Sequence, residues 1–484
     1  MILTDATRVI TTPPAPERRR RWPALTPALV VRVLCALGVL ALWFAPLPVG
    51  PEARATLVVF AAAVWFWVFS QVSDTYVALG AASVLVVIDV IGVDDLFSPL
   101  GDETTWLLIG AFILAGGVAS SGLAMRVAVA LSAGVESPRV LVHLLTLAVV
   151  LTAFAVPATS GRAALVLPVF VVLIGVLPAW LSRVLALALP SVVLFSAVAS
   201  LIGAGAHLIT DQILVGAGLE GFTFTRWMIL GLPLALVSAH LAAEIILLVF
   251  STRRQRRDAL CIRREDLGAG MSVRLSPAET RSLTVLAVAV TLWFTETLHG
   301  IPAAMVAVLG ALLITSPHLG TADLGPAIKQ VPWSLLLFMT ATVALSQALS
   351  SSGAAEVLAS GLLDGMPGWV FVLAVIAVST AAHLLIQSRS ARSAVLVPLV
   401  IATAPAAGVD PVAAAFISTA AAGFCHTLPA SAKPLAIFRG DGPDHHYDTR
   451  DLLIASAWLA PMHLAVTAAF AFFIWPLLGL PLFS

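Results

Sequence analysis

The chain is poor in charged residues, and lysine is almost absent. Only 11% of its 484 residues are Asp, Glu, Lys or Arg, whereas soluble globular domains carry roughly 25%. Lysine occurs only at positions 329 and 433, while 60% of the residues are hydrophobic and the mean hydropathy is +1.02. Apolar runs of ~20 residues, which suffice to cross a ~30 Å hydrocarbon core, recur along the whole length. This composition excludes an ordinary soluble domain and indicates a polytopic membrane protein.

Cysteine is also scarce, which excludes a disulfide-stabilised scaffold. The three cysteines lie in a predicted span (Cys35), a basic loop (Cys261) and another span (Cys425). The segment "DGPDHHYD" at 441–448 groups metal-capable side chains, but its spacing fits no structural metal pattern, so we interpret it as a solvated loop. We expect no cofactor, no metal site and no nucleic-acid partner.

The arginines predict the orientation in the membrane. The N-terminal tail contains Arg18–Arg21, and the segment 251–279 contains seven arginines, so both are expected on the cytoplasmic side. An even number of crossings must then separate them, and six is obtained if 140–183 is a re-entrant hairpin. This count gives eleven crossings, with the N-terminus inside and the C-terminus outside. The first span follows the arginine run without a small-residue cleavage site, so we expect an uncleaved anchor in the cell (plasma or inner) membrane.

The two halves of the chain resemble each other. Because continuous helices satisfy backbone hydrogen bonds in lipid, the expected fold class is all-α, with about 11 transmembrane helices. "TSGRAALVLPV" (159–169) overlays "RSARSAVLVPL" (389–399) without a gap, and weak internal symmetry of this kind is typical of secondary transporters. Five crossings per half make the second copy inverted relative to the first. The predicted parts are a cytoplasmic N-terminal tail (1–28), a first transmembrane helix (29–49), inverted repeat 1 (54–250, re-entrant hairpin about 140–183), a basic cytoplasmic loop (251–279) and inverted repeat 2 (280–484, re-entrant hairpin about 368–403).

Each predicted hairpin carries arginine at its tip. A charged side chain at the bilayer centre costs ~2.5–3.5 kcal/mol on insertion scales, so Arg162, Arg389 and Arg392 need partners. A planar guanidinium suits bidentate binding of a carboxylate or another oxyanion, and broken helices direct the positive ends of their dipoles at the same gap. The alternative is that these arginines pair with helix C-terminal carbonyls or extend to an interface.

The candidate site residues lie at the hairpin tips and in two later segments with polar interruptions, which we expect to be broken helices. Lys433 either binds substrate or reaches the cytoplasmic interface. Asp211 either takes up a coupling proton or neutralises Arg162, and each histidine either takes part in coupling or bonds to the backbone. The predicted substrate-binding residues are Thr159, Ser160, Gly161, Arg162, Ser388, Arg389, Ser390, Arg392, Thr210 and Lys433, and the candidate proton-coupling residues are Asp211, His207 and His426.

After residue 30, the chain resembles the divalent-anion:sodium symporter family of INDY-type dicarboxylate transporters. Members carry a Ser-Asn-Thr signature at each hairpin tip, followed by small residues and Leu-Pro; "AALVLP" and "SAVLVP" fit this tail. The signature falls on 158–160 and 388–390. The Thr-Pro-Pro segments of the family fall near 210–212 and on 432–434. The resemblance implies eleven spans, a homodimer through a scaffold subdomain and elevator-like movement of a transport subdomain.

The departures from the family pattern bear on the coupling ion. Both signature asparagines are absent, Arg389 replaces one of them, and Lys433 replaces a proline. In the family, sodium is held beside the substrate at these tips. A fixed guanidinium there should repel the cation and supply its charge permanently. The hypothesis is therefore a sodium-independent carrier, either an anion exchanger or a proton-coupled one.

The predicted function is secondary active transport of small di- or tricarboxylates, or of a related oxyanion such as sulfate, by alternating access of the elevator type. The chain is not expected to be an enzyme. One alternative is arsenite efflux or sodium/proton exchange, although cation exchange would require paired midplane carboxylates and only Asp211 is present. Another is a transport-inactive receptor or an intramembrane hydrolase, but "TSGRA" comes with no oriented Ser–His pair.

Overall fold

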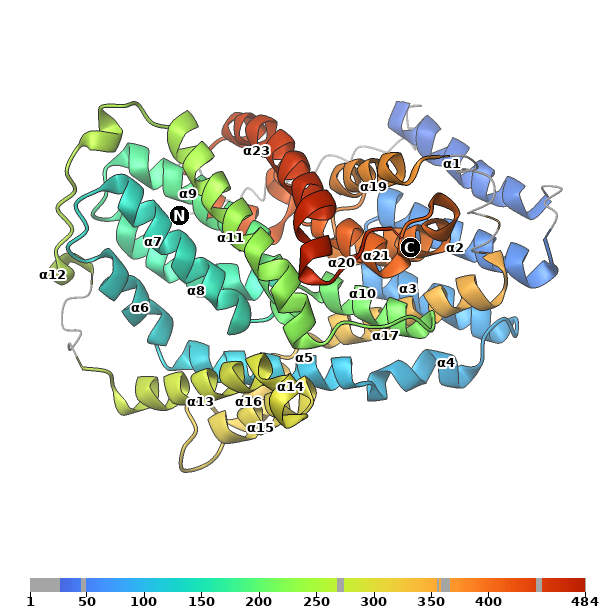
Figure 1. Ribbon diagram of the computed structural model, residues 1–484, viewed down its shortest axis with the longest axis horizontal. Helices are drawn as coiled ribbons and strands as arrows, with labels where there is room; N and C mark the ends of the chain where they lie inside the picture. The colour runs from blue at the N-terminus through green and yellow to red at the C-terminus, as the bar shows by residue number, and fades with distance from the viewer. Residues whose placement is uncertain are drawn as a thin grey trace, which may run out of the picture.

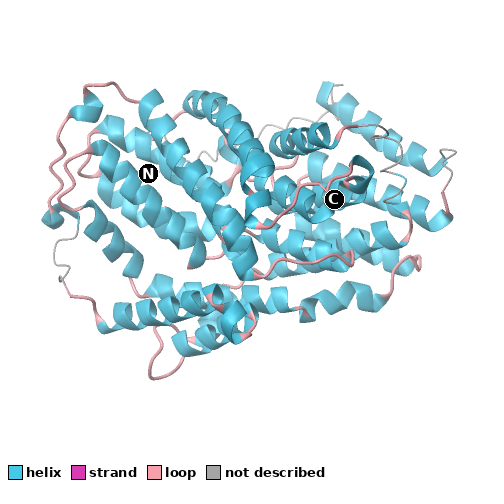
Figure 2. Ribbon diagram, in the orientation of Figure 1, coloured by secondary structure: helices cyan, strands magenta, loops and turns pink. Residues whose placement is uncertain are grey.

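The structure is a computed structural model that describes residues 27–44, 49–267, 274–354, 357, 366–440 and 446–483. These residues form helices joined by loops, in agreement with the predicted all-α class (Figure 2). The predicted N-terminal tail up to residue 26, part of the basic loop (268–273) and residues 441–445 of "DGPDHHYD" lie outside the described residues.

The first half of the chain ends with the long helix α11. Its helices of five or more residues are α1 (Pro27–Phe44), α2 (Pro51–Phe69), α3 (Asp74–Val87), α4 (Val93–Phe97), α5 (Glu103–Ser120), α6 (Leu123–Ser132), α7 (Pro138–Leu151), α8 (Thr159–Ile174), α9 (Ala179–Phe195), α10 (Gly205–Gly216) and α11 (Phe224–Val249).

The second half follows a short helix α12 (Arg264–Leu267). Both halves contain a long helix, a helical hairpin, a broken helix and a final long helix in the same order: α5, α7–α8, α9/α10 and α11, then α17, α19–α20, α21/α22 and α23. The helices of the second half are α13 (Pro277–Phe294), α14 (Glu296–His299), α15 (Ala303–Ile314), α16 (Leu324–Lys329), α17 (Trp333–Ser351), α19 (Gly368–Ala381), α20 (Arg389–Thr403), α21 (Pro411–Ala421), α22 (Lys433–Arg439) and α23 (Thr449–Ala469).

Six of the described helical segments are long and apolar enough to cross a membrane: Pro51–Phe69, Glu103–Ser120, Ala179–Ala199, Phe224–Val249, Trp333–Ser351 and Thr449–Ile474. Several others are apolar but shorter, including α7, α8 and α19 of the two hairpins. The apolar stretch 105–133 forms two helices rather than one, because Gly122 adopts φ +80° between α5 and α6. The stretch 185–217 is interrupted where Ser200 and Ala204 are extended, which separates α9 from α10.

The buried apolar side chains form two clusters. One joins α2, α3, α5, α10, α15, α17 and α21, and the other joins α7, α8, α9, α11 and α22. In Figure 1, α7, α8 and α9 lie at the left, and α5 runs beside α13 and α15 along the lower edge. The contact between α5 and α15 is close, because a Cβ at Gly110 would lie 2.6 Å from the Ala307 carbonyl carbon and one at Gly117 would lie 2.3 Å from Ile314 Cγ1.

Candidate functional site

A cavity of about 1380 Å³ lies where the hairpin tips and the broken helices meet. Its wall is formed by the first turns of α8, α10, α20 and α22, together with the 70–74 connection, parts of α5 and α6, and the start of α17. It therefore joins segments that are separated by more than 300 residues in the chain. The predicted substrate residues that line it are Thr159, Ser160, Gly161, Ser388, Arg389, Ser390, Arg392 and Lys433.

The helices that begin at this cavity include α8, α10 and α20, each of eleven or more residues. The first turn of a helix leaves backbone N–H groups without intrahelical partners, and the helix dipole makes this end positive. The N-cap residues of α8 and α10 are Ala158 and Ala204, and neither has a side chain that can accept from these N–H groups. By contrast, α20 is capped by the Ser388 side chain, which accepts from the Ala391 N–H at 3.2 Å. The uncapped ends favour an anion in the cavity.

The tip of the first hairpin is conformationally strained at Ala158. This residue has φ +67° and ψ 138°, a backbone conformation that residues other than glycine rarely adopt. Its N–H donates to the Ile202 carbonyl at 3.4 Å, which ties the tip to the break between α9 and α10. A strained residue at the mouth of a cavity is typical of a functional site.

The second hairpin tip carries two arginines whose guanidinium groups are only partly hydrogen-bonded. Arg392 is fully buried, and its Nη1 donates to the Phe424 carbonyl at 2.9 Å. Its Nε and Nη2 have no hydrogen-bond partner among the described residues, and neither have Nε and Nη1 of Arg389. Both side chains line the cavity. Because a buried donor without a partner is costly, these nitrogens indicate that a ligand completes the site.

Arg162 does not agree with its predicted role as a substrate ligand. It is fully buried but is not part of the cavity wall, although it aligns with Arg392 in sequence. Its guanidinium donates to two carbonyls and two hydroxyls near the ends of α7 and α9. These acceptors are the Val149 carbonyl (2.8 Å), the Thr152 hydroxyl (3.0 Å), the Val193 carbonyl (3.0 Å) and the Ser196 hydroxyl (2.6 Å). The alternative interpretation, pairing with helix C-terminal carbonyls, describes Arg162 correctly.

Thr210 also lies away from the cavity. Its hydroxyl is fully buried, donates to the Ala206 carbonyl at 2.9 Å and lies 2.6 Å from the Thr419 hydroxyl. The hydroxyl pair joins α10 to α21, so Thr210 connects the two halves rather than facing a ligand. The reason is helical phase, since Thr210 is a turn and a half beyond the start of α10.

Asp211 lies away from both Arg162 and the cavity. Its carboxylate accepts from the Phe222 N–H at 2.6 Å and from the Thr104 hydroxyl at 3.3 Å. No ion pair joins it to Arg162 in the described part of the chain, and it does not line the cavity. Asp211 therefore fixes the connection that precedes α11 against the start of α5, and the predicted neutralisation of Arg162 is wrong.

The two histidines of the broken helices differ from each other. His207 is buried beside the second hairpin tip, with Nε2 3.2 Å from Nη2 of Arg389. His426 lies behind the cavity wall and stacks on Phe195, with 4.6 Å between ring centroids. Neither histidine lines the cavity, so neither is placed to receive a proton directly from it.

One acidic cavity residue was missed from the sequence. Asp74, the first residue of α3, lines the same cavity as the two arginines and Lys433. The polar run "SQVSDT" (70–75) between two apolar spans was the signal that could have identified it. With three cationic side chains and one carboxylate in the wall, two positive charges remain uncompensated.

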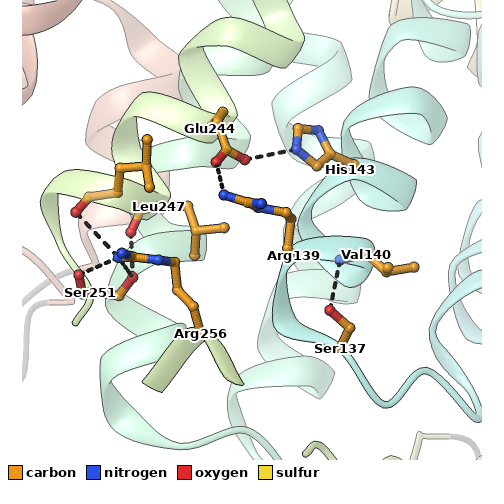
Figure 3. A network of polar contacts seen from close by, with 9 residues as sticks. Ser137, Arg139, Val140, His143, Glu244, Leu247, Ser251 and Arg256 are labelled. Atoms are coloured by element: carbon orange, nitrogen blue, oxygen red, sulfur yellow. Dashed lines mark hydrogen bonds and ion pairs between the residues drawn. The ribbon is translucent and has the colours of Figure 1, made fainter. Parts of the chain in front are cut away.

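A second polar cluster lies between α7 and α11, away from the cavity. Figure 3 shows Arg139 and His143 of α7 converging on Glu244 of α11, with His143 Nε2 3.0 Å from the carboxylate. His143 Nδ1 also lies 2.9 Å from Nδ1 of His240. This cluster fixes the first helix of the hairpin to α11. Among the described residues, no group of three or more His, Cys, Asp or Glu side chains is arranged to hold a metal ion.

Sequence comparison gives a family match over nearly the whole chain. A family model described as the sodium:sulfate symporter transmembrane region matches residues 27–481. A sodium-dependent dicarboxylate transporter, SdcS of Staphylococcus saprophyticus, is 23% identical over 86% of this chain and 86% of its own. A protein of Cupriavidus necator named only as a membrane protein is 26% identical over 61% of this chain, and an uncharacterized transporter of Haemophilus influenzae is 24% identical over 46%. The matches span 60% and 49% of the lengths of these last two relatives.

Two solved transporter structures share the fold. The YdaH transporter of Alcanivorax borkumensis superposes with a TM-score of 0.54 at 17% identity and covers 88% of this chain and 100% of its own. MtrF of Neisseria gonorrhoeae, described with a class of antimetabolite efflux pumps, gives a TM-score of 0.51 at 13% identity over 96% of this chain and 97% of its own. At these identities the likeness concerns the fold alone.

Proposed function

The chain belongs to the sodium:sulfate symporter transmembrane family and is a membrane transporter rather than an enzyme, and from this premise we propose that it carries a small divalent anion. The substrate class is a di- or tricarboxylate, or a related oxyanion such as sulfate. The observation that carries the proposal is the cavity at which the N-termini of α8, α10 and α20 meet two guanidinium groups with unpaired nitrogens. Positive helix ends and planar guanidinium groups both select oxyanions.

The geometry of Arg392 suits a bidentate oxyanion. Its Nη1 is taken by the Phe424 carbonyl, and the unpaired Nε and Nη2 lie on the same edge of the guanidinium plane. A carboxylate or sulfate can accept from both at once, which is the strongest arrangement available to arginine. Thr159 and Ser160 of the first tip line the same cavity, and their hydroxyls can serve as neutral donors. A dianion would also neutralise the two uncompensated charges of the wall.

Fixed charge in the wall supports sodium-independent exchange. Arg389 and Lys433 stand where the family places an asparagine and a proline, so a bound cation beside the substrate would be repelled. An empty site holding buried unpaired guanidinium groups is costly to move through a low-dielectric membrane, because the desolvation penalty amounts to several kcal/mol per ion. The loaded site is compensated by its anion, so movement of the loaded carrier is favoured and one anion is exchanged for another. Proton-coupled transport is the alternative mode.

The wall of the cavity also bears on its orientation. Its loop segments, near 70–74, 122–125 and 330–335, are ones that the arginine distribution predicts on the cytoplasmic side. We therefore interpret this conformation as inward-facing, in a plasma-membrane transporter with a cytoplasmic N-terminus and an external C-terminus. We further propose an elevator-type movement of the hairpins and broken helices within a homodimer.

Ligand-induced stabilisation tests the proposed site. The purified protein is melted with succinate, citrate or sulfate, with and without sodium, because a true ligand raises the melting temperature by mass action. We expect at least one dianion to stabilise the protein equally in sodium and in potassium. The two lysines offer a matched pair: Lys433→Gln should reduce the shift, whereas Lys329→Gln, at an exposed position outside the cavity, should not. No shift with any of the three anions would contradict the proposal.

A further inference from the structure

His207 lies between two hydrogen-bond partners that determine its protonation. Its Nδ1 is 3.0 Å from the Ser200 carbonyl, which can only accept, so Nδ1 carries the hydrogen. Its Nε2 is 3.2 Å from Nη2 of Arg389, which can only donate, so Nε2 is the acceptor. The tautomer assigned in this way is neutral, because a second hydrogen on Nε2 would oppose the hydrogens of the guanidinium.

The ring of His207 is held in place by the first half of the chain. It is fully buried and stacks on Trp227 of α11, with 4.8 Å between ring centroids and 29° between planes. Trp227 is fixed in turn, because its Nε1 donates to the Val198 carbonyl at 3.0 Å. The break between α9 and α10, together with α11, therefore fixes the position of His207 Nε2, the acceptor that faces Arg389.

The guanidinium of Arg389 has little room on its other side. A Cβ at Gly423 would lie 3.0 Å from its Nη2 and 3.5 Å from its Cζ. The group is thus held between the His207 ring and the backbone that follows α21. Its two other nitrogens, Nε and Nη1, are buried and unpaired.

We propose that His207 is a positioning residue for anion transport: as a neutral acceptor it anchors Nη2 of Arg389 and leaves Nε and Nη1 for the substrate. This inference rests on the proposed function. A neutral acceptor is the important feature, since a carboxylate at position 207 would form an ion pair with Arg389 and compete with the anion. The anchor also joins α10 of the first half to the hairpin tip of the second, so both halves determine where the positive charge stands.

Three variants at position 207 separate the parts of this role. His207→Phe keeps a ring against Trp227 but removes the acceptor, His207→Gln restores a neutral acceptor, and His207→Glu adds a charge. Binding of succinate and sulfate is measured by calorimetry, and exchange in proteoliposomes gives KM and the maximal rate. The melting temperature of the ligand-free protein reports folding.

A hydrogen bond to a charged group is worth about 1.5–3 kcal/mol, and tenfold in affinity corresponds to about 1.4 kcal/mol, so His207→Phe should weaken anion binding by about tenfold or more. The loss should appear in KM rather than in the maximal rate. His207→Gln should return to within about threefold of the wild type, which is less than 1 kcal/mol. His207→Glu should bind more weakly than His207→Phe. The effect of His207→Phe should disappear in an Arg389→Gln background, because the two groups act through one contact.

Wild-type affinity in His207→Phe would overturn the inference, as would a His207→Gln variant as weak as His207→Phe with an unchanged melting temperature. The Arg389→Gln variant distinguishes this failure from failure of the proposed function. If Arg389→Gln loses anion binding and His207→Phe does not, only the positioning role is wrong. If neither anion binds the wild type, the proposed function and the inference both fail.

Discussion

The two arginines that align in sequence should respond to substitution in opposite ways. Arg162 donates four hydrogen bonds at 2.6–3.0 Å to groups near the ends of α7 and α9. Hydrogen bonds to charged groups contribute about 1.5–3 kcal/mol each, with strong non-additivity, and breaking a buried charged interaction costs about 3–5 kcal/mol. We therefore expect Arg162→Gln to lower the free energy of unfolding by about 3 kcal/mol or more.

For Arg392, the unpaired nitrogens outnumber the paired ones. It makes one hydrogen bond, to the Phe424 carbonyl, and it buries two nitrogens without partners. Arg392→Gln removes a buried charge whose desolvation is uncompensated, so the ligand-free protein should be as stable as the wild type or more stable. The anion-induced rise in melting temperature should be lost, because the bidentate donor is gone.

Thermal unfolding of both purified variants, with and without succinate or sulfate, measures the contrast. The expected result is a lower melting temperature but a retained anion shift in Arg162→Gln, and an unchanged melting temperature without an anion shift in Arg392→Gln. A stable Arg162→Gln protein that has lost its anion response would refute the reasoning, since it would make Arg162 a ligand after all.

Three further predictions concern the frame around the site. Gly117→Ala should destabilise the protein by about 1–3 kcal/mol, because its Cβ would overlap Ile314; chemical denaturation measures the loss. Ala158→Gly should increase the free energy of unfolding by about 1 kcal/mol, because glycine adopts φ +67° without strain, and a higher melting temperature would show this. Arg126 donates to Glu279 at 2.6 Å, at the start of α13, and this hydrogen bond lowers the pKa of the Glu279 carboxyl. The pKa of Glu279 in the folded protein is thus below its unfolded value of about 4.3. The stabilisation by this carboxylate is therefore complete above about pH 4.3 and is lost as the pH falls through the folded pKa. The melting temperatures of the wild type and of Glu279→Gln should accordingly converge in acid.

The fold class could be predicted because it depends on local patterns. The length of apolar runs, the arginine distribution and the repeated tails "AALVLP" and "SAVLVP" are properties of short segments. The helices found for the hairpins, α7–α8 and α19–α20, fall close to the expected ranges. The break at Gly122 was less accessible, since apolar composition continues across it.

The roles of individual polar residues depended on distant partners and so could not be predicted. Arg162 and Arg392 have nearly the same local sequence, yet Arg162 donates to Val193 and Ser196 whereas Arg392 donates to Phe424. The sequence contains no signal for which of these distant groups is within reach. Asp211 was misplaced for the same reason, because its partners lie on other elements.

Counterflow in proteoliposomes tests the central claim, that fixed positive charge in the cavity makes the protein an anion carrier without sodium. Vesicles are loaded with unlabelled succinate or sulfate, or left unloaded, and uptake of the same labelled anion is followed in sodium-free buffer. We predict accumulation in loaded vesicles only, unchanged when an inward sodium gradient is added. Accumulation in unloaded vesicles that depends on a sodium gradient would contradict the account.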